Sequence, residues 1–518
     1  MKSGSCCGKI FAWAQIKCPN VKPDPDMNHR CKESVKLIQY DDHFCYKVSI
    51  MIKRLYPALL ALLLLPCSMP VSAAGLDDPF SVTGMVATSP TDAGICNNQI
   101  EGRALTLADI VQISLCSNPQ TAAAWASARA AAANVGSSRS SLLPSLSLGG
   151  TAEHNAAATA AVHSVSNQQN LSLSLSYLLY DFGGREAGID NARALLAAAN
   201  ASGNATLQTL FLDATQAYFA LMSARASLDA SRASETSASQ AQEAAAARYR
   251  IGSATKADHL QARTALSQAS LTRIRAEGVM QNALGTLANV MGLEPTVPLQ
   301  FAEAPTARPD TRQEQDVAQL IDQAQHLRPD LAAADARIRA AEADIVSARA
   351  SGMPKLTLDA TASDGRSAAA GAGYANSRNG SIALNIQFPI FTGFDTAYRT
   401  RAAEAQLENS MASRDQVARQ VSLQVWQAYQ NLRSEGQALR ASEDLLASAA
   451  ESEAMSLGRY REGVGNILDL LSAQSAMADA RQQHVTALYN WHAARFSLAQ
   501  AIGALDLTAL QMARSMEQ

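Results

Sequence analysis

The sequence is poor in aromatic residues and carries almost no net charge. Only 5% of the 518 residues are Phe, Trp or Tyr, and the formal net charge is −3. A net charge so close to zero is neither the basic excess of a nucleic-acid-binding protein nor an acidic tail. We therefore expect no nucleic acid among the partners of this chain.

Signatures of catalysis and of cofactor binding are also missing. The eight histidines form neither an HExxH pair nor a Cys/His zinc pattern, and the sequence has no Walker-type lysine loop and no nucleophile elbow. Gly463-Val-Gly465 lacks the third glycine and the preceding strand of a dinucleotide site. The sequence thus predicts no enzyme activity, no cofactor and no metal.

An apolar run near the N-terminus is shorter than the ~20 residues that a membrane-spanning helix needs. It follows the basic pair Lys53-Arg54, and Val71-Ser-Ala73-Ala74 then provides the small residues that signal peptidase requires. Residues 51–74 are therefore predicted to be a signal peptide. Because such a peptide begins at a true N-terminus, we interpret residues 1–50 as a spurious N-terminal extension.

Cysteines are scarce once that segment is removed. Five of the eight lie in residues 1–50, and Cys67 follows Pro66, where a lipoprotein signal would have a small residue. Only Cys96 and Cys116 remain, and two cysteines in an exported chain favour a disulfide. This disulfide would tie the extended segment 75–104 to the first helix. The alternative is that both cysteines are buried free thiols.

What the sequence does contain is a strand that runs directly into a very long helix. Leucine and serine alternate over residues 171–176, and after Gly183-Gly184 a helical period continues to about Arg250. At ~1.5 Å per residue such a rod measures about 100 Å. The same junction recurs where residues 381–391 lead into a second long helix after Gly393. This pattern is typical of a membrane-barrel strand that continues into a tunnel wall.

The two halves of the chain share landmarks at a fixed spacing, which indicates a tandem duplication of a helix–strand–strand–helix unit. The spacing is 211 residues for Tyr218 and Tyr429, Tyr249 and Tyr460, Gly252 and Gly463, Asp258 and Asp469, and Gly292 and Gly503. It is 210 residues for Pro119 and Pro329, and for Pro144 and Pro354. We expect repeats at 105–294 and 313–504, a linker at 295–312, a tail at 505–518, and strands at about 145–154, 169–180, 355–363 and 381–391.

The long helices carry apolar residues at heptad-like spacing, which predicts coiled-coil seams and not a cofactor pocket. Three such series are Leu207, Leu210, Ala214, Tyr218 and Leu221; Val417, Val421, Val425, Ala428 and Leu432; and Leu488, Trp491, Arg495, Leu498 and Ile502.

Four amphipathic strands cannot close a membrane barrel by themselves, and an open sheet in lipid leaves backbone groups unpaired at several kcal/mol each. Three chains supply twelve strands, a number within the range found in closed membrane β-barrels. A soluble sandwich on a coiled-coil stalk has the same strand pattern but leaves the signal peptide and the duplication unexplained. A trimeric, autotransporter-like surface structure also closes twelve strands, but its anchor is C-terminal.

Between about Leu105 and Gly503 the chain resembles the TolC-type outer-membrane efflux proteins. The resemblance rests on Asn118-Pro119, Leu143-Pro144, Tyr180-Asp-Phe-Gly and the two blocks around Asp258 and Asp469; the stretch Leu115-Cys116-Ser-Asn118-Pro119 further resembles the CyaE-like branch for type I secretion. It implies a mainly α fold with a membrane β-barrel portion, in a homotrimer of twelve strands and a coiled-coil tunnel. It also implies outer-membrane lipid, a periplasmic membrane-fusion (adaptor) protein and an inner-membrane ABC or proton-driven pump as partners. The expected function is a passive exit duct.

The hairpin turns are the candidate gate. Gly463 can end one helix and Asn466 can cap the next, so Asp469 could simply support a helix start, and the same holds for Asp258. The resemblance instead places Asp469 in a pore constriction as part of an anionic ring, and Tyr460 in a latch. In that family a second acidic position stands where this chain has Ser472, and an arginine where it has Gly465.

Overall fold

The computed structural model describes residues 78–86, 96, 104–158, 163–302, 316–369 and 373–505. All of them belong to the second of two compact units, Asp78–Gln518. The expected extension 1–50, the signal peptide 51–74, Cys67 and all but the first residue of the expected tail lie outside the described residues. So do most of the N-terminal segment and much of the linker.

Two runs of elements with matching lengths make up the described part, after a short 3-10 helix η4 (Thr83–Met85). The first run is α3 (Leu107–Ser117), α4 (Pro119–Ser140), β1 (Ser145–Ala158), β2 (His163–Tyr180), α5 (Gly184–Arg250) and α6 (Lys256–Val290). The second is α7 (Val317–Leu327), α8 (Pro329–Ala350), β3 (Lys355–Ala369), β4 (Ala375–Gln387), α9 (Asp395–Arg461) and α10 (Ile467–Ala501). Helices α5 and α9 both contain 67 residues, and α6 and α10 both contain 35. The duplicated, mainly helical unit is therefore confirmed.

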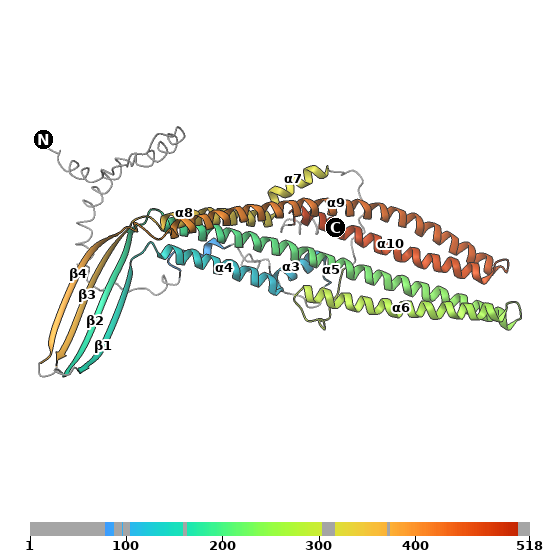
Figure 1. Ribbon diagram of the computed structural model, residues 1–518. Coiled ribbons are helices and arrows are strands. Elements are labelled where there is room, and N and C mark those ends of the chain that lie inside the picture. Colours follow the sequence, from blue (N-terminus) through green and yellow to red (C-terminus); the bar gives the residue numbers. More distant parts are fainter. Residues whose placement is uncertain are drawn as a thin grey trace, which may run out of the picture. The chain divides into compact units, whose positions relative to one another are not determined.

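The four strands form one antiparallel sheet in the order β1-β2-β3-β4 (Figure 1). The β2–β3 pair joins the two repeats, with Leu173 opposite Ala362. Among the described residues, β1 and β4 each pair with a single strand, so the sheet of one chain has two free edges.

The strand bounds differ from the predicted ones in two ways. The segments expected to be polar loops continue the strands, so that β1 reaches Ala158 and β3 reaches Ala369. Ladder hydrogen bonds use only the backbone, and small polar side chains therefore do not stop a strand. In contrast, β4 ends at Gln387 and not at residue 391, because its partner Lys355 is the first residue of β3; Pro389 then has no N–H with which to extend the ladder.

Large apolar side chains are exposed on the edge strands. Leu146 and Leu148 of β1 are 66% and 69% exposed, and Leu384 and Ile386 of β4 are 59% and 72% exposed. Each pair is separated by one residue, so its side chains lie on one face of the strand. Exposed apolar patches of this kind mark surfaces that contact a membrane or another chain.

The long helices form two hairpins, α5–α6 and α9–α10, which pack together through α5 and α10 (Figure 1). Helix α4 packs along α5, and α8 packs against both α5 and α9. The predicted seam faces inward, since Leu210, Ala214, Tyr218 and Leu221 are all buried. None of the helices in the described ranges combines the length and the apolarity needed to cross a membrane.

The glycines that end α6 and α10 allow a short helix to dock closely on each end. Gly292 and Gly503 have φ values of 71° and 79°. A Cβ atom would lie 2.6 Å from the carbonyl oxygen of Ser117 at the first glycine, and 3.0 Å from that of Leu327 at the second. Both the backbone conformation and the space thus require glycine at these repeated landmarks.

Candidate gate at the hairpin tips

Each long hairpin turns at a glycine in the left-handed region. Gly252 follows α5 with φ 77°, and Gly463 follows α9 with φ 83°. An L side chain is strained at these angles, so glycine ends each long helix and lets the chain reverse. The predicted helix-ending role of Gly463 agrees with this geometry.

At the first tip, the carboxylate of Asp258 belongs to a complete capping box. The backbone N–H of Asp258 donates to Oγ1 of Thr255 at 3.1 Å, and the N–H of Thr255 donates to Oδ2 of Asp258 at 2.9 Å. Two of the otherwise unpaired N–H groups of α6 are satisfied in this way. The helix-support interpretation therefore describes Asp258 well.

The second tip differs, because only half of the capping box is present. The N–H of Asp469 donates to Oδ1 of Asn466 at 2.8 Å, but no N–H returns to the carboxylate of Asp469. Within the described part of the chain that carboxylate has no hydrogen-bond or ion-pair partner, and the residue is exposed. Ser472, three residues further along α10, is exposed as well, so the two side chains share a face of the helix.

Tyr460, unlike the exposed Asp469, is buried. The residue is 4% exposed and packs with a small apolar cluster in which the two hairpins meet; the cluster includes Ala241, Ala245, Ala262, Ile467 and Leu470. Burial raises the pKa of the Tyr460 hydroxyl, while Arg248 lowers this pKa and Asp258 raises it. The hydroxyl oxygen has no hydrogen-bond partner among the described residues. Among the described residues, this hydroxyl therefore forms no hydrogen bond that could act as a latch.

Arg248 of α5 holds the end of α9 instead. Its guanidinium lies over the Tyr460 ring, 4.3 Å from the centroid. Its Nη2 donates to the carbonyl oxygen of Tyr460, and to that of Arg461 at 3.3 Å. The last carbonyl groups of a helix have no partner within the helix and carry partial negative charge, which makes them good acceptors for a guanidinium.

Of the predicted site residues, the structure brings Tyr460 and Gly463 to Arg248, and Asp258 lies close enough to raise the pKa of Tyr460. No hydrogen bond or ion pair links Asp469 or Ser472 to this group within the described ranges. Arg248 was not among the residues predicted from the sequence. The repeat spacing could have identified it, since Arg248 and Arg459 stand immediately before the matched tyrosines.

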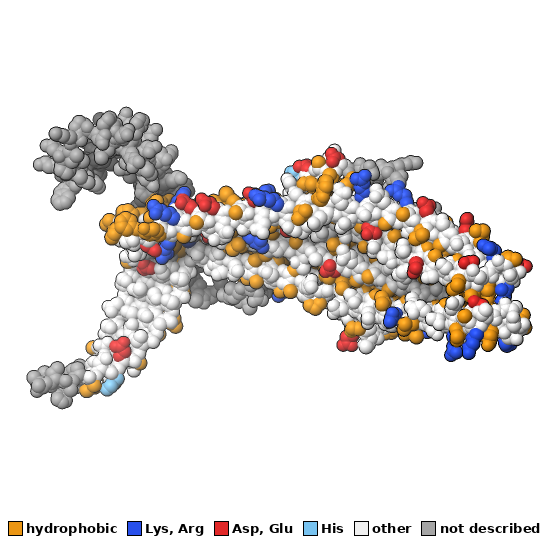
Figure 2. All heavy atoms as spheres, turned by 45° about the vertical axis from the view of Figure 1, so that its right-hand side comes forward, with side chains coloured by type: hydrophobic (Ala, Val, Ile, Leu, Met, Phe, Trp, Pro, Cys, Tyr) orange, Lys and Arg blue, Asp and Glu red, His pale blue; other side chains and the backbone are white. Residues whose placement is uncertain are grey.

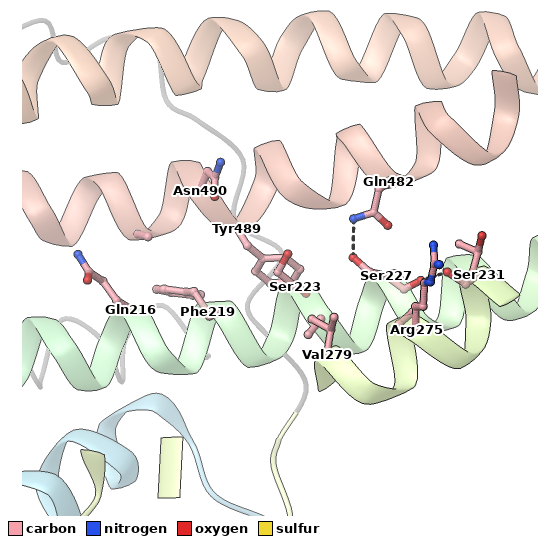
Figure 3. Close-up of a pocket in the computed structure, with 15 residues that line it drawn as sticks. Gln216, Phe219, Ser223, Ser227, Ser231, Arg275, Val279, Gln482, Tyr489 and Asn490 are labelled. Atoms are coloured by element: carbon pink, nitrogen blue, oxygen red, sulfur yellow. Dashed lines mark hydrogen bonds between the residues drawn. The ribbon is translucent and has the colours of Figure 1, made fainter. Parts of the chain in front are cut away.

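A groove of about 560 Å³ lies along the middle of α5, away from the hairpin tips, and is bounded by α5, α6 and α10 (Figure 3). Gln482 of α10 crosses it to donate to Oγ of Ser227 on α5 at 2.9 Å. Arg275 is the one charged residue of its lining. The groove thus holds no acid–base pair, and the described residues contain no group of His, Cys, Asp or Glu that could hold a metal ion.

Cys96 and Cys116 form a disulfide, with their Cα atoms 5.7 Å apart. The bond ties the segment before α3 to the last turn of that helix. The alternative of two buried thiols does not describe this structure.

Comparisons with known proteins agree with this architecture. The family profile described as outer membrane efflux protein matches residues 110–293 and again residues 320–504. Protein CyaE of Bordetella pertussis is 31% identical over 385 residues, which cover 74% of this chain and 80% of the relative. Outer membrane protein TolC of Vibrio cholerae is 26% identical over 407 residues, which cover 77% and 91%. The solved structure of the outer-membrane channel OprN has the same fold, with a TM-score of 0.68 at 22% identity over 77% of this chain and 90% of that one.

Paired strands that continue into paired helical rods, present twice in one chain, define an outer-membrane channel with a periplasmic tunnel. The chain belongs to the outer membrane efflux protein family. Members of this family are channel proteins and not enzymes. The function is that of an exit duct for efflux or secretion, and not that of a stalk with a surface anchor.

Proposed function

We propose that three copies of this chain associate, and that their twelve strands close into one barrel in the outer membrane. The observation that carries this proposal is the sheet of one chain, with free edges at β1 and β4 and exposed apolar side chains on both edge strands. Unpaired strand edges in lipid cost several kcal/mol for each backbone group. Pairing β4 of one copy with β1 of the next removes all free edges at once.

The same association brings six long hairpins together around one axis. We infer that they form the periplasmic tunnel, whose far end contacts a membrane-fusion (adaptor) protein and, through it, an inner-membrane pump. The duct performs no chemistry, and the pump supplies the energy for transport. The higher identity to CyaE than to TolC supports the type I secretion branch, in which the pump is an ABC transporter and not a proton-driven one.

We propose Asp469 as the charge of the gate. Its carboxylate is exposed and unpaired, whereas that of Asp258 is engaged in a capping box. Three symmetry-related copies of Asp469 would form an anionic ring that binds cations and disfavours anions. The residue one helical turn further along α10 is Ser472, which carries no charge, so only one ring of carboxylates would form.

The test is the native mass of the signal-cleaved protein extracted from outer membranes in mild detergent. We expect a trimer that requires detergent, and crosslinking in cells should recover an adaptor and an ABC transporter. A water-soluble monomer that never associates with lipid would overturn the proposal. A trimer that crosslinks to a proton-driven pump would support the exit-duct function but exclude the assignment to type I secretion.

A further inference from the structure

The clamp made by Arg248 joins the two repeats of one chain. Its guanidinium covers the Tyr460 ring and binds the final carbonyl groups of α9. The clamp therefore holds the tip of the second hairpin against the first. If the tips move apart, the ring contact and the carbonyl contacts are lost together.

The duplication supplies a second set of the same groups, which do not contact each other in a clamp among the described residues. Arg459 occupies in α9 the position that Arg248 occupies in α5, and Tyr249 corresponds to Tyr460. Arg459 is exposed, and its side chain has no hydrogen bond, ion pair or ring contact among the described residues. Tyr249 is 43% exposed, against 4% for Tyr460.

Tyr249 is nevertheless held in a fixed orientation. Its ring stacks on His259 at 5.7 Å between centroids and an angle of 5°. This contact covers one face of the ring and leaves the other face for a further partner. A guanidinium is well suited to that face, because an aromatic ring attracts a cation placed over it.

The helix packing indicates where that guanidinium comes from. Within one chain α5 lies between α6 and α10, and α10 lies between α5 and α9, so α6 and α9 have the outer flanks. Within the chain, the first long helix of one repeat packs on the second long helix of the other. If this relation continues around the trimer, α9 of one copy lies beside α6 of the next.

We propose that Arg459 of each copy clamps the end of α5 in the neighbouring copy, with its guanidinium over the Tyr249 ring and on the carbonyl oxygens of Tyr249 and Arg250. The closed tunnel then has six clamps, alternating within and between chains. The proposal rests on the trimer of the proposed function. Figure 2 shows basic side chains gathered where the hairpins turn, and the last turns of α5 and α9 supply Arg248, Arg250, Arg459 and Arg461.

A photocrosslinking residue tests the contact directly. Tyr249→p-benzoylphenylalanine is placed in the full chain and irradiated in outer membranes, and the native mass of the same sample is measured. We expect a covalent dimer of chains in which the crosslinked peptide comes from the end of α9 around Arg459. A trimer without that product overturns the clamp and leaves the duct intact, whereas the absence of any trimer overturns the proposed function.

Single-channel recordings provide the energetic test. Arg459→Ala should increase the probability of the open state about two- to fivefold, as expected for loss of an exposed cation–π contact. Tyr249→Ala should act similarly, and the double variant should add little to either single variant because both remove one interaction. Arg440→Ala removes an exposed charge from α9 away from the helix end and should leave opening unchanged. Equal effects of Arg459→Ala and Arg440→Ala, or full additivity in the double variant, would contradict the clamp.

Discussion

The guanidinium carbon of Arg248 lies 4.3 Å from the ring centroid of Tyr460, although 212 residues separate this arginine from the carbonyl group it binds. The contact joins the tips of the two hairpins, which come from different repeats of the chain. The tips of the two hairpins are thus held together by a long-range contact, while each turn is fixed by its own glycine.

Arg248→Ala should loosen this end of the duct. The last carbonyl groups of α9 lose their donor, and we expect the open probability of single channels in planar bilayers to rise about two- to fivefold. Arg248→Lys keeps the charge but not the planar fork, so its effect should be smaller. Arg232, whose contact on the same helix is the exposed ion pair with Asp229, is the matched control. If Arg232→Ala opened the channel equally, the effect would be one of charge and not of the clamp.

Asp469→Ala should remove the cation-binding ring. We expect a higher single-channel conductance, or the loss of block by divalent cations, because the three carboxylates no longer attract cations into the constriction. Asp469→Asn keeps the size of the side chain and should behave like the alanine variant. Currents and cation sensitivity equal to those of the unmodified channel would show that Asp469 does not face the pore.

Asp258→Ala should act on stability and not on ion block. It breaks the reciprocal bonds with Thr255, and the first turn of α6 should be destabilised by about 1 kcal/mol. Hydrogen exchange of the N–H groups at the start of α6 measures this directly. Asp469→Asn, which leaves the Asn466 cap in place, should not accelerate exchange at the start of α10. Altered cation block in the Asp258 variant would assign this carboxylate to the pore after all.

His492 should make the helical part sensitive to acid. It is fully buried and stacks on Phe219, and neither ring nitrogen has a hydrogen-bond partner in the part of the chain that the structure describes. Burial, with a smaller effect from Arg495, lowers its pKa from 6.5 to about 4. Between these pH values the unfolded chain binds a proton that the folded chain does not. Stability is therefore complete above pH 6.5 and falls on acidification, by up to about 3 kcal/mol near pH 4.

The measurement is the melting temperature at pH 7.5 and at pH 5, compared between the unmodified protein and His492→Phe. The phenylalanine ring can keep the stack on Phe219 but cannot take up a proton, so the variant should lose less stability at pH 5. Equal losses in both proteins would show that other groups cause the acid sensitivity.

Reduction should destabilise the region around α3. The Cys96–Cys116 bond spans 20 residues, and constraining a loop of this size in the unfolded chain contributes about 3 kcal/mol. Dithiothreitol should therefore lower the melting temperature of the unmodified protein. A variant with both cysteines replaced by serine should melt at the temperature of the reduced protein and ignore the reductant. A melting temperature that does not respond to reduction would argue against a stabilising role.

Much of the fold follows from the sequence because its signals are local. The hydrophobic period changes from two in β2 to 3.6 in α5 at Gly183, and the buried positions Leu210, Ala214 and Tyr218 are those that the heptad spacing selects. The ends of the strands were less predictable. The polar residues just before Leu171 give no apolar alternation, yet they pair with partners in β1 that only the assembled sheet provides.

The candidate site shows the same division. Gly463, Asn466 and Asp469 could be placed at a turn from their order alone, since caps depend on residues a few positions apart. Which of the two aspartates keeps a free carboxylate could not be deduced, because Thr255 and Asn466 both read as good caps. Arg248 was missed because its partner belongs to the other repeat.

The sequence by itself determined the duplication, the strand-to-rod junctions and the turns, since all of these depend on the spacing of neighbouring residues. The tertiary structure alone decided which tyrosine is buried and which arginine reaches it. Two repeats with the same landmarks pack on each other in only one order, α6–α5–α10–α9. Corresponding positions of the two repeats therefore meet different neighbours: Tyr460 packs in the cluster where the two hairpins meet, whereas Tyr249 stays 43% exposed.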